Sequence, residues 1–271
     1  MPDRDDVLTE LGLTPVWRRR ALGGAGAVDA SGAETIDAPQ RSDETAGVRA
    51  PAAAAAVGTV DAPRATESRT ARIAKVEWRD FAQDVDSCTA CGLARGRRKS
   101  VPGVGDPHAE WLFVGEAPGA EEDARGEPFV GQAGKLLDNM LAALGMKRGE
   151  NVYIANVLKC RPPNNRTPEP LEVEACQPYL DRQIALIRPK IIVALGKSAA
   201  TTLLAVEASI ASLRGRVHRY RGVPLVVTYH PAYLLRNLPD KAKAWEDLLF
   251  ARRTLRGAGA ADPAQSADLN V

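Results

Sequence analysis

The sequence has no long hydrophobic run and is poor in cysteine, histidine and aromatic residues. No stretch approaches the roughly 20 apolar residues that a membrane-spanning helix needs, so we expect a cytoplasmic protein that does not enter a membrane. The 4 cysteines among 271 residues are too few for a secreted scaffold built on disulfides. A hydrophobic content of 45% is still sufficient for a buried core, so much of the chain should be globular.

Charge is distributed unevenly along the chain, although the net formal charge is only +2. Residues 71–260 contain 28 Lys and Arg against 21 Asp and Glu, whereas the remaining residues contain 8 against 13. The central part is therefore moderately basic, which suits a polyanionic partner. An ordinary solvated surface explains a charge of this size equally well.

The two ends of the chain differ from its middle in composition. Residues 1–70 are rich in Ala, Gly, Pro, Asp and Thr and contain one aromatic residue, Trp17. This composition buries too little apolar surface to offset the entropy of ordering, so we predict a flexible, low-complexity tail. Its first residues could bind a protein partner or simply fray. Residues 257–271 are predicted to be a disordered tail as well, which leaves 71–256 as the folded domain.

Short apolar runs alternate with helical patterns in that domain. The apolar runs are often β-branched and bounded by turn residues, as is typical of buried strands. They lie at 111–114, 152–155, 191–195 and 225–229. The helical patterns lie at about 133–144, 170–187, 198–206 and 239–255. This alternation predicts an α/β protein, with three α/β/α layers around a central four-stranded parallel sheet.

Ligands of such folds bind beyond the carboxyl ends of the strands. The segments that follow the predicted strands are rich in polar residues, Gly or Pro, and they comprise 115–119, 156–166, 196–198 and 230–233. We therefore expect the functional side chains in these four segments.

The four cysteines have a spacing typical of ligands. Cys88 and Cys91 form a C-x-x-C pair before the first strand, Cys160 follows the second strand, and Cys176 comes 16 positions later. Thiolates in this pattern suit a metal ion or an iron–sulfur cluster, while unligated core cysteines and disulfides are the alternatives. The spacing does not distinguish zinc from iron.

Several motifs together resemble one known family. They are the Cys88-x-x-Cys91 pair, Gly115-Glu116-Ala117-Pro118-Gly119, Gly126-Glu127-Pro128-Phe129-Val130-Gly131, the run from Asn156 to Pro168, Cys176, and His230-Pro231-Ala232-Tyr233. In this order and spacing they are similar to the iron–sulfur branch of the uracil-DNA glycosylase superfamily, often called family 4. The resemblance covers about residues 78–255 and implies a 4Fe-4S cluster on Cys88, Cys91, Cys160 and Cys176.

The resemblance also implies a function. A monomer of this family flips uracil out of single- or double-stranded DNA and hydrolyses the N-glycosidic bond, leaving an abasic site. The implied uracil pocket contains Gly115, Glu116, Ala117, Phe129, Asn156 and His230. The ring of Phe129 stacks on the base in the family, although an isolated Phe after a turn is more often a core residue.

Two of these side chains have a chemical reason to face uracil. The carboxamide of Asn156 can complement the donor at N3 and the acceptor at O4, although an Asn at a strand end can also merely close a turn. His230 is the candidate donor to the uracil 2-oxygen, where negative charge develops as the bond breaks. We expect His108 and His218 to be solvated or to face phosphates.

Water activation is less clearly encoded. A related branch has an aspartate where this sequence has Ala117, so that general base is absent. Glu116 and Glu122 are the catalytic candidates, and either could position water or exclude a thymine methyl group. A dissociative route with little need of a base is also possible.

The remaining expectations concern DNA. Residues predicted to contact it are Lys197, Ser198, Arg161, Arg166, Tyr233, Leu234 and Arg236, the first two because they open a helix after a strand. Covalent capture of uracil DNA is one alternative function. Because the Lys-Arg-Arg-Ile-His insertion of a capturing sister branch is missing after the second strand, we favour turnover. A catalytically inactive, DNA-binding accessory protein is the other alternative.

Overall fold

The structure is a computed structural model that describes residues 67–260. The predicted tails at 1–70 and 257–271 therefore lie largely outside the described residues, as does the segment that could bind a protein partner. Both predictions remain expectations. The first described helix begins at Arg69 and the last ends at Ala260.

The core of the fold is a mixed sheet with the strand order β1-β3-β2-β4-β6-β5. Its strands are β1 (Val104–Gly105), β2 (Trp111–Gly115), β3 (Val152–Asn156), β4 (Ile191–Leu195), β5 (His218–Tyr220) and β6 (Val223–Thr228). The four predicted strands correspond to β2, β3, β4 and β6, which pair in parallel. The α/β class is confirmed, but the sheet that the described residues form has six strands and not four.

The two additional strands pair antiparallel at the edges of the sheet. They were missed because β1 has 2 residues and β5 has 3, too few to produce an apolar run. β5 also consists of His218, Arg219 and Tyr220, whose composition does not indicate a buried strand.

Side chains of the central strands alternate between two apolar clusters. Leu112 and Val114 belong to a cluster with helices on one face, whereas Trp111 and Phe113 belong to a cluster on the other. β2, β3 and β4 are buried over their whole length, which explains why they are nearly continuous apolar runs in the sequence. The sheet therefore has both faces covered.

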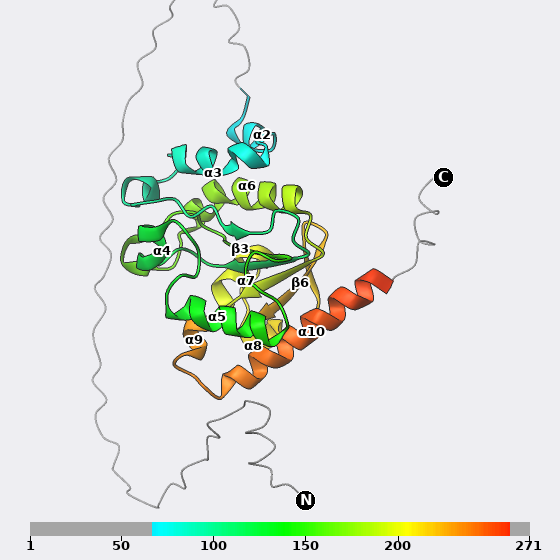
Figure 1. Cartoon of the computed structure of the whole chain (residues 1–271). Helices are drawn as coiled ribbons and strands as arrows, with labels where there is room; N and C mark the ends of the chain where they lie inside the picture. Colours follow the sequence, from blue (N-terminus) through cyan, green and yellow to red (C-terminus); the bar gives the residue numbers. More distant parts are fainter. Residues whose placement is uncertain (1–66, 261–271) are drawn as a thin grey trace, which may run out of the picture. The chain divides into compact units, whose positions relative to one another are not determined.

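Helices form the outer layers (Figure 1). α6 (Pro170–Ile187), α7 (Lys197–Leu204) and α8 (Ile210–Leu213) pack on one face, and α5 (Gln132–Ala143) and α10 (Asp240–Ala260) pack on the other. α2 (Arg69–Ile73) and α3 (Trp78–Ser87) lie against the outer side of α6. The short helices are η1 (Gly92–Arg95), α4 (Ala120–Arg125), η2 (Pro163–Asn165) and α9 (Pro231–Leu234). None of the helices in residues 67–260 is long and apolar enough to cross a membrane.

A buried ion pair joins α10 to the segment before β5. Arg214 Nε donates to Asp247 Oδ2 at 2.6 Å, and the two side chains are 14% and 3% exposed. The guanidinium also lies 4.8 Å from the ring centroid of Tyr229, the residue that follows β6. The ion pair therefore packs against Tyr229 and stabilises the end of β6.

We predict that Asp247→Ala lowers the free energy of unfolding by roughly 3–5 kcal/mol, because it leaves the Arg214 charge buried without its partner. Urea unfolding of the variant measures this change. Glu246→Ala removes the neighbouring, exposed carboxylate and should change stability by less than about 0.5 kcal/mol. Equal stabilities of the two variants would contradict the role of the pair.

Candidate functional site

The candidate site lies where the parallel strands end. β2, β3, β4 and β6 point the same way, so their carboxyl ends meet at one edge of the sheet. Backbone pairing continues beyond the strands: Val157 N donates to Gly115 O at 2.9 Å, and Gly196 N donates to Thr228 O at 2.8 Å. These bonds fix the start of each loop that carries a predicted side chain.

A pocket of about 520 Å³ opens at this edge. Nine of its lining residues were predicted from the sequence: Glu116, Ala117, Glu122, Phe129, Asn156, Arg166, His230, Tyr233 and Arg236. Six were not, namely Pro118, Gly119, Ala133, Pro162, Asn165 and Ala232. The structure thus brings together side chains from three strand ends and from the segment before α5.

Three predicted side chains meet inside the pocket. The rings of Phe129 and His230 are stacked, with centroids 5.5 Å apart and planes inclined by 30°. Asn156 is 2% exposed, and its Oδ1 has no hydrogen-bond partner. Gly115 permits this packing, because a Cβ there would lie 2.4 Å from Asn156 Oδ1 and 2.7 Å from Phe129 Cζ. The unpaired amide oxygen is a vacant acceptor for a ligand.

His230 has a defined tautomer. It is the N-cap of α9, and its Nδ1 accepts a hydrogen bond from Ala232 N at 3.1 Å. Burial lowers the pKa of His230 to about 4; the carboxylate of Glu122 opposes this shift and Arg236 adds to it. The imidazole is therefore neutral near pH 7, with its proton on Nε2, and it can donate a hydrogen bond from that atom.

The two candidate carboxylates differ in their bonding. Both oxygens of Glu122 accept backbone hydrogen bonds, from Gly119 N and Val130 N at 3.1 Å each. Glu116 Oε1 is buried with no partner. Burial raises the pKa of the Glu116 carboxyl, and a hydrogen bond to Ser198 opposes the rise. Glu122 thus ties two loops together, while Glu116 keeps an acceptor available.

All four cysteines line one small cavity, and none of them forms a disulfide. Within residues 67–260, no three His, Cys, Asp or Glu side chains form a group that could hold a single metal ion, whereas the four sulfurs surround a cavity. Three sulfur atoms accept hydrogen bonds: Cys88 from Arg69 Nη2 at 3.3 Å, Cys160 from Arg97 Nη1 at 3.1 Å and Cys176 from Lys159 N at 3.3 Å. Such donors are typical partners of metal-bound thiolates.

Apolar surroundings complete this cavity, which is lined by Val85, Ala90, Ala94, Ala175 and Tyr179 in addition to the sulfurs, Arg97 and Lys159. Burial raises the pKa of Cys176 to about 11, with Lys159 opposing the rise. A buried thiolate therefore needs cationic compensation. The donor set, four thiols with two nearby cationic side chains, fits an anionic iron–sulfur cluster.

Lys159 links the cysteine cavity to the pocket, although it was not among the predicted site residues. Its Nζ donates to Asn156 O at 2.7 Å and to Gln183 Oε1 at 2.5 Å. The side chain is fully buried, and this burial lowers its pKa to about 8. Only the tertiary contacts show that Lys159 touches both the cysteine cavity and Asn156 of the pocket.

The predicted DNA contacts are not all exposed. Leu234 is 1% exposed and packs in a core cluster with Tyr229 and Ala244, so it cannot reach DNA as the prediction required. Its neighbour Leu235 is 42% exposed, since the single turn of α9 places the two residues on different sides. Tyr233 lines the pocket and donates from its hydroxyl to Asp240 Oδ2 at 2.6 Å.

The predicted basic residues have different surroundings. Lys197 and Arg236 are exposed. Arg166 lines the pocket, yet its guanidinium is paired with Glu172 at 2.6 Å and with Glu169 at 3.0 Å. Arg161 Nε donates to Asn165 Oδ1 at 2.7 Å. Lys197 and Arg236 are therefore the two that present a charge free of such pairing.

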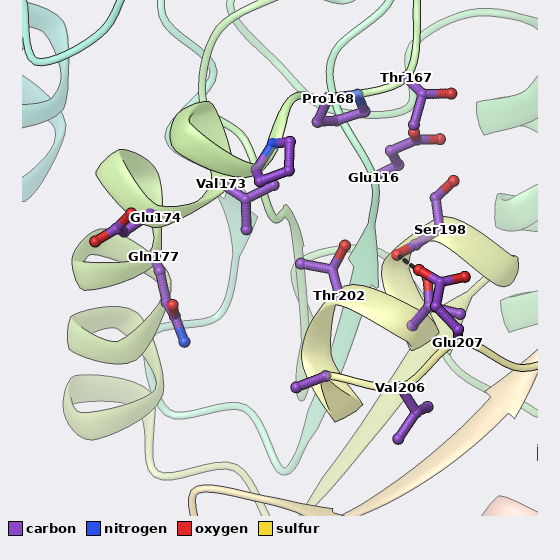
Figure 2. A pocket seen from close by; sticks show the side chains of 13 residues that line it. Glu116, Thr167, Pro168, Val173, Glu174, Gln177, Ser198, Thr202, Val206 and Glu207 are labelled. Carbon is purple, nitrogen blue, oxygen red and sulfur yellow. Dashed lines mark hydrogen bonds between the residues drawn. The ribbon is translucent and has the colours of Figure 1, made fainter.

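A second pocket, of about 460 Å³, shares Glu116 with the first. Figure 2 shows that it lies between α6 and α7, with Glu116, Thr167, Ser198 and Thr202 around it. Ser198, predicted to bind DNA, faces this second pocket. Among residues 67–260, Glu116 is thus the one residue that lines both pockets.

Comparison with known proteins agrees with this geometry. The profile of the uracil DNA glycosylase superfamily matches residues 102–249. A type-4 uracil-DNA glycosylase of Archaeoglobus fulgidus is 50% identical over 164 residues, which are 58% of this chain and 82% of that protein. The type-4 enzyme of Thermotoga maritima is 44% identical over 179 residues, 65% of this chain and 93% of its own.

A more distant relative is a type-5 uracil-DNA glycosylase of Thermus thermophilus, 34% identical over 155 residues, 49% of this chain and 68% of that protein. The match to the type-4 proteins is stronger in identity and in coverage. The chain therefore belongs to the uracil DNA glycosylase superfamily, in its type-4 branch.

Proposed function

We propose that this protein is a monofunctional uracil-DNA glycosylase that removes uracil from DNA and leaves an abasic site. The observation that carries the proposal is the buried amide of Asn156, whose oxygen has no partner although it lies in a pocket beside Phe129 and His230. A base inside a duplex must leave the stack to enter such a pocket. The type-4 relatives, which are named for this activity, support the same reading.

Base selection follows from the hydrogen-bonding capacity of the amide. Uracil presents a donor at N3, which the free Oδ1 of Asn156 can accept, and an acceptor at O4, which the amide nitrogen can reach as a donor. Cytosine presents the opposite pattern at both positions. The ring of Phe129 supplies a stacking face next to the amide.

Bond cleavage expels uracil as an anion, so the site must stabilise negative charge on the base. We infer that His230 donates from Nε2 to the uracil 2-oxygen. Because Ala232 N occupies Nδ1, the proton of the neutral ring is on the remaining nitrogen. A neutral donor suffices here, since preorganised hydrogen bonds are strong in a site from which water is excluded.

The pH dependence tests this role. His230 has a folded pKa of about 4, so above that pH the ring is neutral and the catalytic rate should show no inflection due to His230 near 6.5. The low pKa also means that protonation disfavours the folded state as the pH falls from about 6.5 towards 4. Single-turnover rates between pH 5 and 8 measure this. The proposed role would be contradicted by an inflection of the single-turnover rate near pH 6.5 that disappears in His230→Gln.

Of the two carboxylates, we propose that Glu116 positions the attacking water. Glu116 Oε1 has no partner, whereas both oxygens of Glu122 are occupied by backbone N–H groups. Glu122 instead keeps the Phe129 loop attached to the start of α4. Ala117 adds no charged group, which leaves room in the pocket beside Glu116.

DNA binding is proposed to involve the exposed rim of the pocket. Arg236 lines the pocket together with Tyr233 and can contact phosphates, as can the exposed Lys197 at the start of α7. Because Leu234 is buried, we propose that the exposed Leu235 contacts DNA in its place and fills the space that the flipped base leaves. Ser198 remains a candidate for a phosphate contact at the start of α7.

We further propose that Cys88, Cys91, Cys160 and Cys176 hold a 4Fe-4S cluster. The four thiols surround one cavity, and hydrogen bonds from Arg69 and Arg97 reach two of the sulfurs. When bound, the cluster would cross-link the segments before β2 and after β3 and would supply no group to the reaction. We propose that its role is structural, as the family resemblance implies.

The cluster proposal has a direct test. Anaerobically purified protein should contain about four iron atoms per chain, as a cluster held by four cysteines requires. Cys176→Ala should lose the iron, the visible absorbance and much of the thermal stability. A wild-type protein that contains zinc, or one that is iron-free and equally stable, would rule the cluster out.

Excision itself is tested with labelled uracil-containing single-stranded and duplex DNA, incubated with the purified protein and then treated with alkali. Strand breaks after alkali show excision. A shift that resists denaturants indicates covalent capture of the DNA, and neither outcome indicates an accessory protein. Breaks that precede alkali treatment would contradict a monofunctional enzyme, since no lysine nucleophile is assigned.

Replacing the side-chain amide of Asn156 should abolish most of the uracil excision activity. We predict that Asn156→Asp loses roughly 100-fold or more in kcat/KM, because a carboxylate cannot donate to O4 and repels the developing anion. Asn139→Asp is the matched control, as it makes the same change at an exposed position of α5 and should retain wild-type activity. Unchanged excision by Asn156→Asp would refute this assignment.

A further inference from the structure

Phe129 has a backbone conformation that is unusual for a bulky residue. Its φ is 55°, in the left-handed region that a side chain with a Cβ disfavours sterically. The residue belongs to the segment between α4 and α5, so no regular secondary structure imposes this conformation. Such a backbone persists only when the surrounding contacts hold it, and residues of this kind cluster at functional sites.

Arg148 provides the contacts on one side of Phe129. Its Nη1 donates to Pro128 O at 2.9 Å and its Nη2 donates to Phe129 O at 2.9 Å. These carbonyl groups belong to the two peptide units that flank the Phe129 Cα. A single guanidinium therefore fixes both peptide planes, and with them the direction of the ring.

Asp138 orients the guanidinium. Arg148 Nε donates to Asp138 Oδ1 at 2.9 Å, and this carboxylate is on α5, the helix that follows the Phe129 segment. The Arg148 side chain is 21% exposed, whereas Asp138 is 48% exposed. The more exposed Asp138 carboxylate thus accepts a hydrogen bond from Arg148 Nε. The carbonyl oxygens of Pro128 and Phe129 accept hydrogen bonds from the two other guanidinium nitrogens.

Other neighbours leave the segment little freedom. Gly134 of α5 packs directly on Phe129 O, where a Cβ would lie only 1.7 Å away. On the far side, Val130 N donates to Glu122 Oε1 at 3.1 Å. With Gly134 against it, the Phe129 carbonyl depends on Arg148 for its hydrogen bond, and a buried carbonyl without a partner is costly.

We propose that Arg148 is a positioning residue that holds the ring of Phe129 in the orientation needed to stack on the extruded base, an inference that rests on the proposed function. Arg148 does not line the pocket and does not touch the reacting atoms. An arginine is needed because its planar fork places two donors on neighbouring acceptors, whereas the ammonium of lysine is a point charge.

The test compares Arg148→Ala, Arg148→Lys and the control Arg182→Ala in the full-length protein. Arg182 is also part-buried and donates to a backbone carbonyl, Val76 O at 2.7 Å, but it lies away from the pocket. Three quantities are measured for each variant: kcat/KM for uracil excision, the inhibition constant of free uracil, and the dissociation constant for undamaged DNA.

For Arg148→Ala we expect kcat/KM to fall roughly 100-fold and the inhibition constant of uracil to rise at least about tenfold, the scale of losses caused by a misplaced site group. Binding of undamaged DNA should stay within about twofold of wild type, since the rim residues are untouched. Arg148→Lys should be intermediate, and Arg182→Ala should match wild type in all three quantities. A purely structural role would lower uracil and DNA binding together.

Asp138→Asn keeps the proposal testable if Arg148→Ala does not fold, because Asp138 is half exposed and its replacement should leave folding intact. This variant should weaken uracil inhibition several-fold while DNA binding is retained. The proposal is overturned if Arg148→Lys and Asp138→Asn both bind uracil as wild type does, or if Arg148→Ala behaves like Arg182→Ala. A wild-type protein without excision activity would instead overturn the proposed function.

Discussion

Parallel pairing of β2 with β3, continued past the ends of both strands, holds Asn156 beside Gly115. Every other feature of the pocket is arranged around this contact. Only a glycine leaves space for the amide and for the ring of Phe129, and the neighbouring pair β4 and β6 brings His230 to the same edge. Lys159 Nζ donates a hydrogen bond to the Asn156 carbonyl, and the backbone N–H of Lys159 donates to Cys176 Sγ. Through Lys159, the cysteine cavity therefore helps to hold Asn156 in place.

The pocket keeps several groups in states that folding alone does not favour. A buried polar atom without a partner costs about 1–3 kcal/mol, and Asn156 Oδ1 and Glu116 Oε1 are both of this kind. Phe129 adds a left-handed backbone. Such departures from local preference are expected at sites that bind something, because the ligand supplies what the fold leaves out. Within residues 67–260, two of the three buried side-chain atoms without a partner line this pocket beside Phe129, which is a physical argument for function that is independent of any relative.

The sequence predicted the four parallel strands from local pattern, whereas most of the pocket residues were implied by the resemblance to a known family. Buried strands appear as short apolar runs, and Asn156 and His230 directly follow two of them. Residues whose role depends on tertiary contacts were missed. Arg148 binds carbonyl groups of a separate segment, and Lys159, although it lies in the run from Asn156 to Pro168, is held by a buried hydrogen bond to Gln183 of α6. The wrong assignment of Leu234 has a similar origin, since only the orientation of α9 decides that Leu234 is buried and Leu235 exposed.

The account depends most on the claim that the pocket recognises uracil by hydrogen bonding before any bond is broken. The most direct measurement is the affinity of the wild-type protein for DNA that carries a single 2′-fluoro-deoxyuridine, which resists cleavage, compared with DNA that carries 2′-fluoro-deoxycytidine. We expect the uridine DNA to bind at least about tenfold more tightly, the factor that 1.4 kcal/mol of hydrogen-bond discrimination produces. Equal affinities for the two DNAs would contradict it.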